Sequence, residues 1–203
     1  MMTSSKQHII PEAVWQSSQH IISAIFLLVS LLFLTTNTIA EPLKRDANSH
    51  FFHVSFNNLQ EEIEQAKEEG KQGVFIMFSD PDCPWCLKMK STIMSRVAVQ
   101  EYYKKHFRVL HIDTRGNGLM SDFTGTEMSE KDFAFKVHRV RATPVFMVFD
   151  LKGKDLLRYT GATRDSREFK MLGEYVVSKA YKNTNFTRYK RNQLAKIDKQ
   201  WGR

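Results

Sequence analysis

Apolar residues recur along the chain with two periods, which predicts that strands and helices alternate after residue 50. Short apolar runs predict strands, whereas apolar residues spaced three and four apart predict helices. The predicted strands cover residues 51–56, 73–79, 107–113, 144–150 and 155–161, and the predicted helices cover 57–70, 83–105, 129–140 and 165–182. This β-α-β-α-β-α-β-β-α order indicates an α/β fold in which helices flank both faces of a mixed central sheet, without a second domain.

Polar residues and glycines mark the ends of several predicted elements. Asn57 or Asn58 is expected to cap the first helix, and Ser129 is expected to cap the third. Gly153 provides the positive φ that the hairpin turn between the last two strands requires. Residues 114–129 are rich in glycine and hydroxyl side chains, so we expect an unusually long loop there.

The first forty residues are predicted to lie outside this fold. An uncharged apolar run, 21–34, precedes Thr38 and Ala40, which stand at the positions that a signal peptidase reads. We expect a secretory signal cleaved after Ala40; the alternative is an uncleaved anchor, because a helix over 21–39 would span roughly 28 Å. Either segment would place the domain outside the cytoplasm. The expected parts are a signal or anchor (1–40), a linker (41–49), a folded domain (50–183) and a basic tail (184–203).

The 203-residue chain carries a net charge of +8, and its basic residues are dense after Lys179. A solvated surface that keeps the protein soluble explains this charge, and so does contact with acidic partners or membrane phosphates. Leu194, Ile197 and Trp201 give the tail a loose helical pattern. The tail is therefore expected to be a helical extension of the domain or a contact for a partner or an anionic membrane.

Cys83 and Cys86 are the only cysteines, and they follow a buried strand at the start of a predicted helix. This spacing places both sulfurs on one helix face, where they can form a small disulfide ring or share a metal. Unpaired amides at a helix start stabilise an anion, so we expect Cys83 to be exposed and its pKa to be lowered. A ring this small would stabilise the fold weakly, which favours thiol–disulfide exchange over a structural disulfide.

A metal site is the alternative chemistry for the two cysteines. Four histidines could complete a copper or zinc site with them, but none stands at motif spacing: His53, His106, His111 and His138. Haem attachment needs a histidine directly after the second cysteine, where the chain has Leu87. We therefore predict no metal and no cofactor other than the Cys83–Cys86 disulfide itself.

Residues 50–183 resemble the thioredoxin superfamily, and more narrowly the exported thioredoxin-related proteins of the SoxW type. The resemblance is carried by the strand–turn–CPWC–helix unit, by RATPVFMVFD about sixty residues later, and by the hairpin Asp150–Lys154 with its following turn, 159–161. The long connection 114–129 also resembles the SoxW-type proteins. The resemblance implies a thioredoxin-like sheet flanked by helices.

By this resemblance Cys83 is the attacking thiol and Cys86 the resolving thiol. Thr143 and Pro144 would form a cis-proline loop that faces the disulfide and aligns the substrate backbone. Trp85, between the cysteines, is expected to be exposed as part of an apolar docking patch.

The chain departs from the thioredoxin pattern beneath the cysteines. Thioredoxin carries a buried acid six residues before its first cysteine, where this chain has Met77. Asp80 and Asp82 lie in the turn; Asp82 is expected to be a turn or cap residue, with a catalytic base as the alternative. The dipeptide between the cysteines is Pro84-Trp85 instead of thioredoxin's Gly-Pro. Because these two residues help to set the reduction potential, the resemblance leaves the direction of electron flow open.

The sequence thus predicts an extracytoplasmic, periplasmic thiol–disulfide oxidoreductase that reduces disulfides of protein clients. The resemblance implies a membrane electron donor, and we expect a monomer that binds no nucleic acid. The alternative is a module of the same fold that holds a metal or a peptide without turnover.

Overall fold

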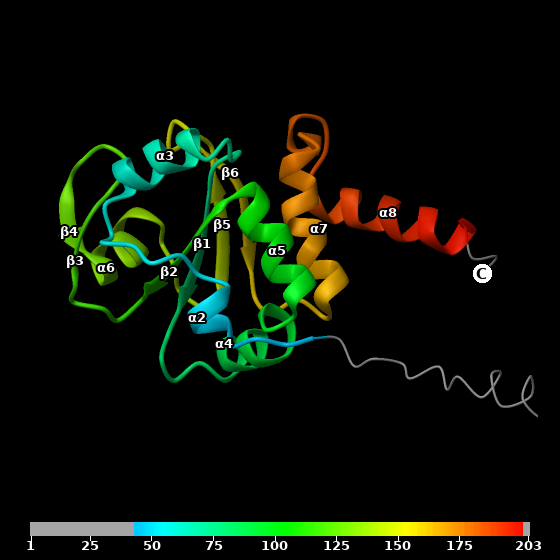
Figure 1. Cartoon of the computed structure of the whole chain (residues 1–203), viewed down its shortest axis with the longest axis horizontal. Coiled ribbons are helices and arrows are strands. Elements are labelled where there is room, and N and C mark those ends of the chain that lie inside the picture. The colour runs from blue at the N-terminus through cyan, green and yellow to red at the C-terminus, as the bar shows by residue number, and fades with distance from the viewer. Residues whose placement is uncertain (1–42, 201–203) are drawn as a thin grey trace, which may run out of the picture. The chain divides into compact units, whose positions relative to one another are not determined.

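The computed structural model describes residues 43–200, which contain a four-stranded mixed sheet (Figure 1). The strands are β1 (Val74–Ser79), β2 (Arg108–Asp113), β5 (Val145–Phe149) and β6 (Asp155–Thr160), in the spatial order β2-β1-β5-β6. β1 pairs in parallel with β2 and antiparallel with β5, and β5 pairs antiparallel with β6. Every residue of β1 is buried, as expected for a strand with neighbours on both sides and helices on both faces.

Helices cover both faces of the sheet, which confirms the predicted fold class (Figure 1). They are α2 (Ala47–His50), α3 (Leu59–Glu68), α4 (Pro84–Met89), α5 (Val97–His106), α6 (Glu130–Asp132), α7 (Ser166–Val177) and α8 (Phe186–Gln200), with two short π-helices, η1 (Lys90–Met94) and η2 (Phe133–Val137), and a 3-10 helix, η3 (Ala180–Lys182). On one face, α4, α5 and α7 bury a core that includes Phe75, Tyr103 and Phe169. On the other, α3 and η2 bury a second core that includes Ile76 and Phe133.

The first predicted strand, residues 51–56, does not form. The Asp46 side chain caps α2 by accepting a hydrogen bond from the Ser49 N–H at 2.8 Å, and the helix ends at His50, with Phe51 as its C-cap. Phe51 and Phe52 are both buried in the core beneath α5 and α7. Neighbouring residues of a strand point to opposite faces, so two adjacent aromatic rings in one core are incompatible with the predicted strand.

The predicted helix over residues 83–105 is divided into α4, η1 and α5. Arg96 has an extended conformation, with ψ of 124°, and separates η1 from α5. At this break the Arg45 N–H donates to the Ser95 carbonyl at 2.8 Å. A segment fifty residues earlier in the chain thus pairs with the backbone at the break. The spacing of apolar residues within 83–105 could not predict this contact.

The predicted loop over residues 114–129 contains a small hairpin, formed by β3 (Leu119–Ser121) and β4 (Glu127–Ser129). Asp122 stabilises its turn, because the carboxylate accepts hydrogen bonds from the N–H groups of Thr124 and Thr126 at 2.7 and 2.9 Å. Met120 is buried against the second core. Phe123 and Met128 also pack against this core, partly buried. The hairpin is therefore anchored by a few separate apolar side chains in a polar segment, which is why the sequence did not reveal it.

The predicted boundary residues occupy their expected positions. Asn58 caps α3 by accepting from the Gln60 N–H at 3.2 Å, and Ser129 caps α6 by accepting from the Asp132 N–H at 3.1 Å. Gly153 has a φ of +76° in the turn between β5 and β6. The helix predicted over 165–182 is shorter than expected, because α7 ends at Val177.

The basic tail begins with a helix that packs against α7. The rings of Phe186 and Tyr189 lie 5.7 and 5.4 Å from the ring of Tyr175. Lys190 forms an ion pair with Glu168 at 2.6 Å. These contacts hold the first turns of α8 on the domain; the function of the tail stays a prediction.

The predicted signal or anchor segment lies outside the residues that the structure describes. Between residues 43 and 200, no helix combines the length and the apolar character needed to cross a membrane.

His53 covers the outer edge of β2. The backbone N–H of His53 donates to the Val109 carbonyl at 2.8 Å, and the ring Nδ1 of His53 accepts from the Val109 backbone N–H at 2.9 Å. Burial, followed by the charges of Arg108 and Lys71, lowers the pKa of His53 to about 4. The neutral His53 ring therefore accepts the Val109 N–H at the edge of β2, whereas a protonated ring would have no free nitrogen to accept it.

Replacing His53 with glutamine is expected to reduce the acid sensitivity of the fold. Between pH 6.5 and 4 the unfolded chain binds a proton at His53 that the folded chain does not, so stability is complete above pH 6.5 and is lost as the pH falls towards 4. After discounting for partial exposure, the wild type should lose about 1 kcal/mol more than His53→Gln between pH 7 and pH 5. Urea unfolding at both pH values measures this difference.

His50→Gln is the matched control, because His50 is exposed on α2. Its loss of stability on acidification should equal that of the wild type. An equal loss in His53→Gln would contradict the assignment.

Candidate functional site

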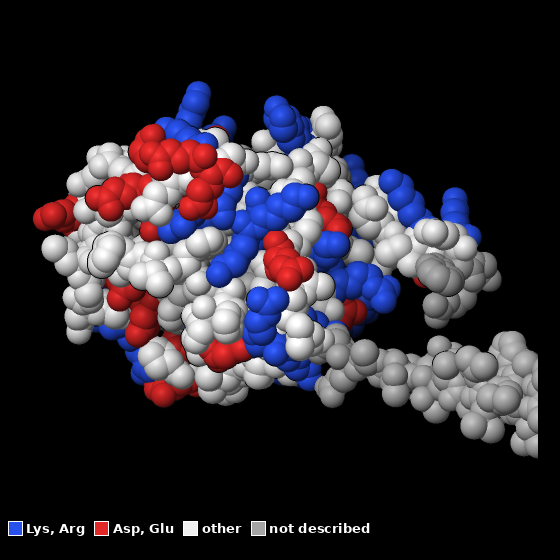
Figure 2. Space-filling model, in the orientation of Figure 1, with Lys and Arg blue, Asp and Glu red and all other residues white. Residues whose placement is uncertain are grey.

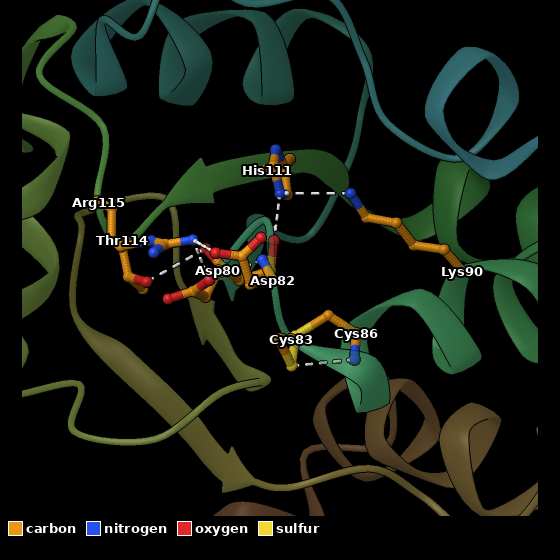
Figure 3. Close-up of a disulfide and its surroundings, with 9 residues drawn as sticks. Asp80, Asp82, Cys83, Cys86, Lys90, His111, Thr114 and Arg115 are labelled. Carbon is orange, nitrogen blue, oxygen red and sulfur yellow. Dashed lines mark hydrogen bonds and ion pairs between the residues drawn. A yellow bond between two sulfur atoms is a disulfide. The ribbon is translucent and has the colours of Figure 1, made fainter.

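The disulfide between Cys83 and Cys86 lies where β1 leads into α4 (Figure 3). β1 ends at Ser79, a short turn follows, and Cys83 caps α4, whose first residue is Pro84. Proline fits this position because a first-turn residue has no intrahelical use for its N–H. The Cys83 Sγ accepts a hydrogen bond from the Cys86 N–H at 3.1 Å. α4 continues directly into η1, so the positive end of this helical stretch meets the Cys83 sulfur.

The expectation that Cys83 is exposed is wrong for the disulfide form. Cys83 is 8% exposed and Cys86 is 2% exposed. The Cys83 sulfur turns inward, towards the helix amide and towards the sulfur of Cys86, which belongs to the core. Cys83 is still the more accessible of the two, which agrees with its assignment as the attacking thiol.

Asp80 and Asp82, in the turn before Cys83, share one arginine. Arg115 lies 2.7 Å from the Asp80 carboxylate and 2.5 Å from that of Asp82 (Figure 3). The hydrogen bond from Arg115 to Asp82 raises the pKa of the guanidinium. The Asp80 side chain also accepts from the Asp82 N–H at 2.8 Å, so these aspartates are turn residues. Arg115 offsets the repulsion that two carboxylates would exert on a Cys83 thiolate.

Thr143 and Pro144 lie at the same end of the sheet as the disulfide. Val145 pairs with Phe78 in the β1–β5 ladder, so Pro144 stands beside the carboxyl end of β1. The peptide bond between Thr143 and Pro144 is cis. The Pro144 carbonyl accepts a hydrogen bond from the Gly161 N–H at 2.8 Å, which joins this loop to the end of β6. Thr143 is half-buried and Pro144 is buried.

Trp85, between the two cysteines, is 57% exposed. The Lys88 Nζ lies 5.0 Å from the centre of its ring, within the range of a cation–π contact. The Trp85 ring is exposed, as predicted. Its role in docking a client stays a prediction.

Ser79, Lys90 and His111 form a polar cluster near the disulfide; Lys90 and His111 are labelled in Figure 3. The His111 Nε2 is 2.5 Å from the Ser79 hydroxyl and 3.5 Å from the Lys90 Nζ. Burial, followed by the Lys90 charge, lowers the pKa of His111 to about 4, so the ring is neutral at pH 7. Met77 is fully buried and pairs with His111 across β1 and β2. Thioredoxin's carboxylate position is thus apolar here, next to a neutral histidine.

The histidines considered as metal ligands do not gather with the cysteines. Within residues 43–200, no group of three or more His, Cys, Asp or Glu side chains could hold a metal ion. Instead, His53 forms a hydrogen bond with the backbone of Val109, and His111 forms one with the Ser79 hydroxyl.

Sequence reasoning missed Arg115, Lys90 and the segment Gly161–Thr163, which surround the predicted residues. Arg115 follows β2 and Lys90 follows α4. A basic residue after a strand is common, so no signal in the sequence distinguished Arg115. Gly161 belonged to the recognised Tyr-Thr-Gly turn, and that motif was the available clue.

No curated protein matches the chain. A thioredoxin-fold protein from Helicobacter pylori is 19% identical and covers 61% of this chain and 87% of its own, with a TM-score of 0.49. The oxidised DsbD C-terminal domain of Neisseria meningitidis is 18% identical and covers 56% and 88%, with a TM-score of 0.43. A putative disulphide-isomerase from Bacteroides thetaiotaomicron is 19% identical and covers 66% and 97%, with a TM-score of 0.46.

At these identities and scores, the solved structures carry no information about activity. The profile of the thioredoxin-like domain family, in contrast, matches residues 59–177, which include both cysteines, Thr143, Pro144 and all four strands of the central sheet. The chain therefore belongs to the thioredoxin-like domain family.

Proposed function

We propose that this protein is a thiol–disulfide oxidoreductase that reduces disulfides of protein clients outside the cytoplasm. The observation that carries the proposal is the Cys83–Cys86 pair at the start of a helix, beside the Thr143–Pro144 loop. The helix amides favour a Cys83 thiolate, and Cys86 lies close enough to form a disulfide with it.

The reaction transfers two electrons to the client. In the reduced protein, the Cys83 thiolate attacks one sulfur of the client disulfide, and the other client sulfur leaves as a thiolate that takes up a proton. A mixed disulfide now joins Cys83 to the client. Cys86, after losing its proton, attacks the Cys83 sulfur and releases the second client thiol. The product is the Cys83–Cys86 disulfide present in the structure.

The remaining parts of the proposal concern the surroundings of this reaction. The exposed Trp85 ring and the backbone at Thr143 and Pro144 would hold the client, which would add to the loop as an extended strand. The predicted signal supports a periplasmic location, and the SoxW-type resemblance supports a membrane electron donor that reduces the disulfide again. The protein would act as a monomer, without metal, nucleic acid or other cofactor.

Insulin-disulfide reduction tests the proposed function. With dithiothreitol as the electron source, the full chain should accelerate the precipitation of reduced insulin, and a Cys83→Ala/Cys86→Ala variant should not exceed the rate with dithiothreitol alone. Equal rates for the two proteins, together with stoichiometric binding of copper or zinc by the wild type, would support a binding module instead.

A further inference from the structure

A groove begins beside the cysteine pair and runs between the helices that follow it and the start of α7. Its first part has a volume of about 500 Å³ and lies between Trp85 and Met89 on α4 and Ala162 and Thr163 after β6. A second part, of about 540 Å³, lies between the starts of α5 and α7. The two parts share Arg96 and Ser166, so together they form one extended surface, here called the basic groove.

Positive side chains line both parts of the basic groove. Lys88, Arg96 and Arg164 line the first part, and Arg167 and Lys170 are added in the second. On the face drawn in Figure 2, Lys and Arg predominate over α5 and α7, whereas Asp and Glu gather over α3.

The two carboxylates in the groove are already engaged. Asp165 caps α7, where it accepts a hydrogen bond from the Glu168 N–H at 2.8 Å, and its carboxylate lies 3.7 Å from the Arg164 Nε. Glu101 lies 3.2 Å from Arg45, a cation outside the groove. In the part of the chain that the structure describes, no carboxylate lies within ion-pair distance of Arg96, and its Nε donates to the Thr92 carbonyl at 3.0 Å. Lys170 also lies 3.6 Å from Glu174, so two of the five groove cations already face a carboxylate. Among the residues that the structure describes, no ion pair involves the other three, Lys88, Arg96 and Arg167, and these are the charges that an acidic ligand could neutralise.

The position of the basic groove links this charge to the redox site. One wall includes Trp85, which stands between the two cysteines. The other wall includes Ala162, directly after Gly161, and the Gly161 N–H donates to the Pro144 carbonyl. A polypeptide whose disulfide lies at Cys83 therefore passes the mouth of the groove.

We propose that the basic groove binds an acidic segment of the client polypeptide next to the cysteine under attack. The proposal rests on the proposed reductase function and defines its substrate class as disulfides flanked by Asp or Glu. Several cations around one groove raise the local concentration of such segments and speed their association, and salt weakens the effect. The apolar side chains of Trp85 and Met89 leave room for a peptide backbone between the charges.

Two disulfide-bonded model peptides of equal length test the proposal, one with four glutamates beside its cysteine and one with glutamines instead. At low salt, the kcat/KM of the wild-type protein should be about tenfold higher for the glutamate peptide than for the glutamine peptide. In Arg96→Gln/Arg164→Gln this ratio should fall to about twofold or less, as it should for the wild type in 0.5 M NaCl. Lys67→Gln/Lys136→Gln, which removes two cations from α3 and η2, should keep the wild-type ratio.

A binding measurement separates this inference from the reductase function. The fluorescence anisotropy of a fluorescein-labelled, cysteine-free acidic peptide should rise when the oxidised wild-type protein binds it. The affinity of Arg96→Gln/Arg164→Gln for the same peptide should be about tenfold lower. Equal binding to both proteins, or an unchanged kcat/KM ratio, would overturn the groove as the site. If the acidic peptide bound but neither disulfide peptide were reduced, the basic groove would be supported as a binding site and the reductase function would be refuted.

Discussion

Cys86→Ala is expected to accumulate a mixed disulfide between Cys83 and its client, whereas Cys83→Ala should form none. Cys83 is the more exposed of the two residues and caps α4, so it can attack a client without Cys86. Once Cys86 is absent, no neighbouring thiol can release the captured client. Turnover of insulin should fall at least about 100-fold in both variants, because either half of the exchange is lost.

Non-reducing gel electrophoresis with mass spectrometry identifies the trapped species. The purified, reduced variants are incubated with insulin and quenched with an alkylating agent. Lys67→Gln, a change on an exposed ion pair of α3, is the matched control for handling and should retain full turnover. Trapping by Cys83→Ala through Cys86 would reverse the assigned roles, and trapping by neither variant would refute the exchange mechanism.

Arg108→Met is expected to destabilise the fold by about 3–5 kcal/mol, because it leaves the Glu62 carboxylate buried without its cation. The Arg108 Nε donates to Glu62 at 2.8 Å, and the two side chains are 8% and 3% exposed. This pair fixes α3 against β2, at the face opposite α5 and α7. Urea unfolding at pH 7 measures the loss.

Two variants control for the loss of charge itself. Arg45→Met breaks an exposed pair, whose side chains are 42% and 69% exposed, and should cost about 1 kcal/mol or less. Arg108→Met/Glu62→Leu removes both buried charges and should recover most of the stability lost in Arg108→Met. If Arg108→Met lost no more stability than Arg45→Met, the buried pair would have no special role.

The elements with strong local signals were predicted correctly. β1 was recognised from a continuous apolar run, and Asn58, Ser129 and Gly153 were recognised from cap and turn chemistry that involves only the next few residues. The cysteine pair was found in the same way, because three residues of separation at a strand-to-helix junction define its geometry.

Errors arose where distant segments decided the outcome. The alternation in residues 51–56 predicted a strand, but Phe51 and Phe52 both enter one core formed by helices much later in the chain. The break before α5 depends on a backbone pairing of Arg45 with Ser95, fifty residues away. The hairpin within 114–129 depends on the burial of Met120 against the second core.

By itself, the sequence determined the family, the order of most elements and the two sulfurs, since each of these is written in residues close together in the chain. Tertiary structure alone decided that Arg115 pairs with both aspartates of the turn before Cys83, that Glu62 and Arg108 meet in the interior, and that α4, α7 and the residues just before α5 and α7 bring five cations around one groove. The physical reason is that these charges act through distances in space, and the folded backbone sets those distances between residues that share no local pattern.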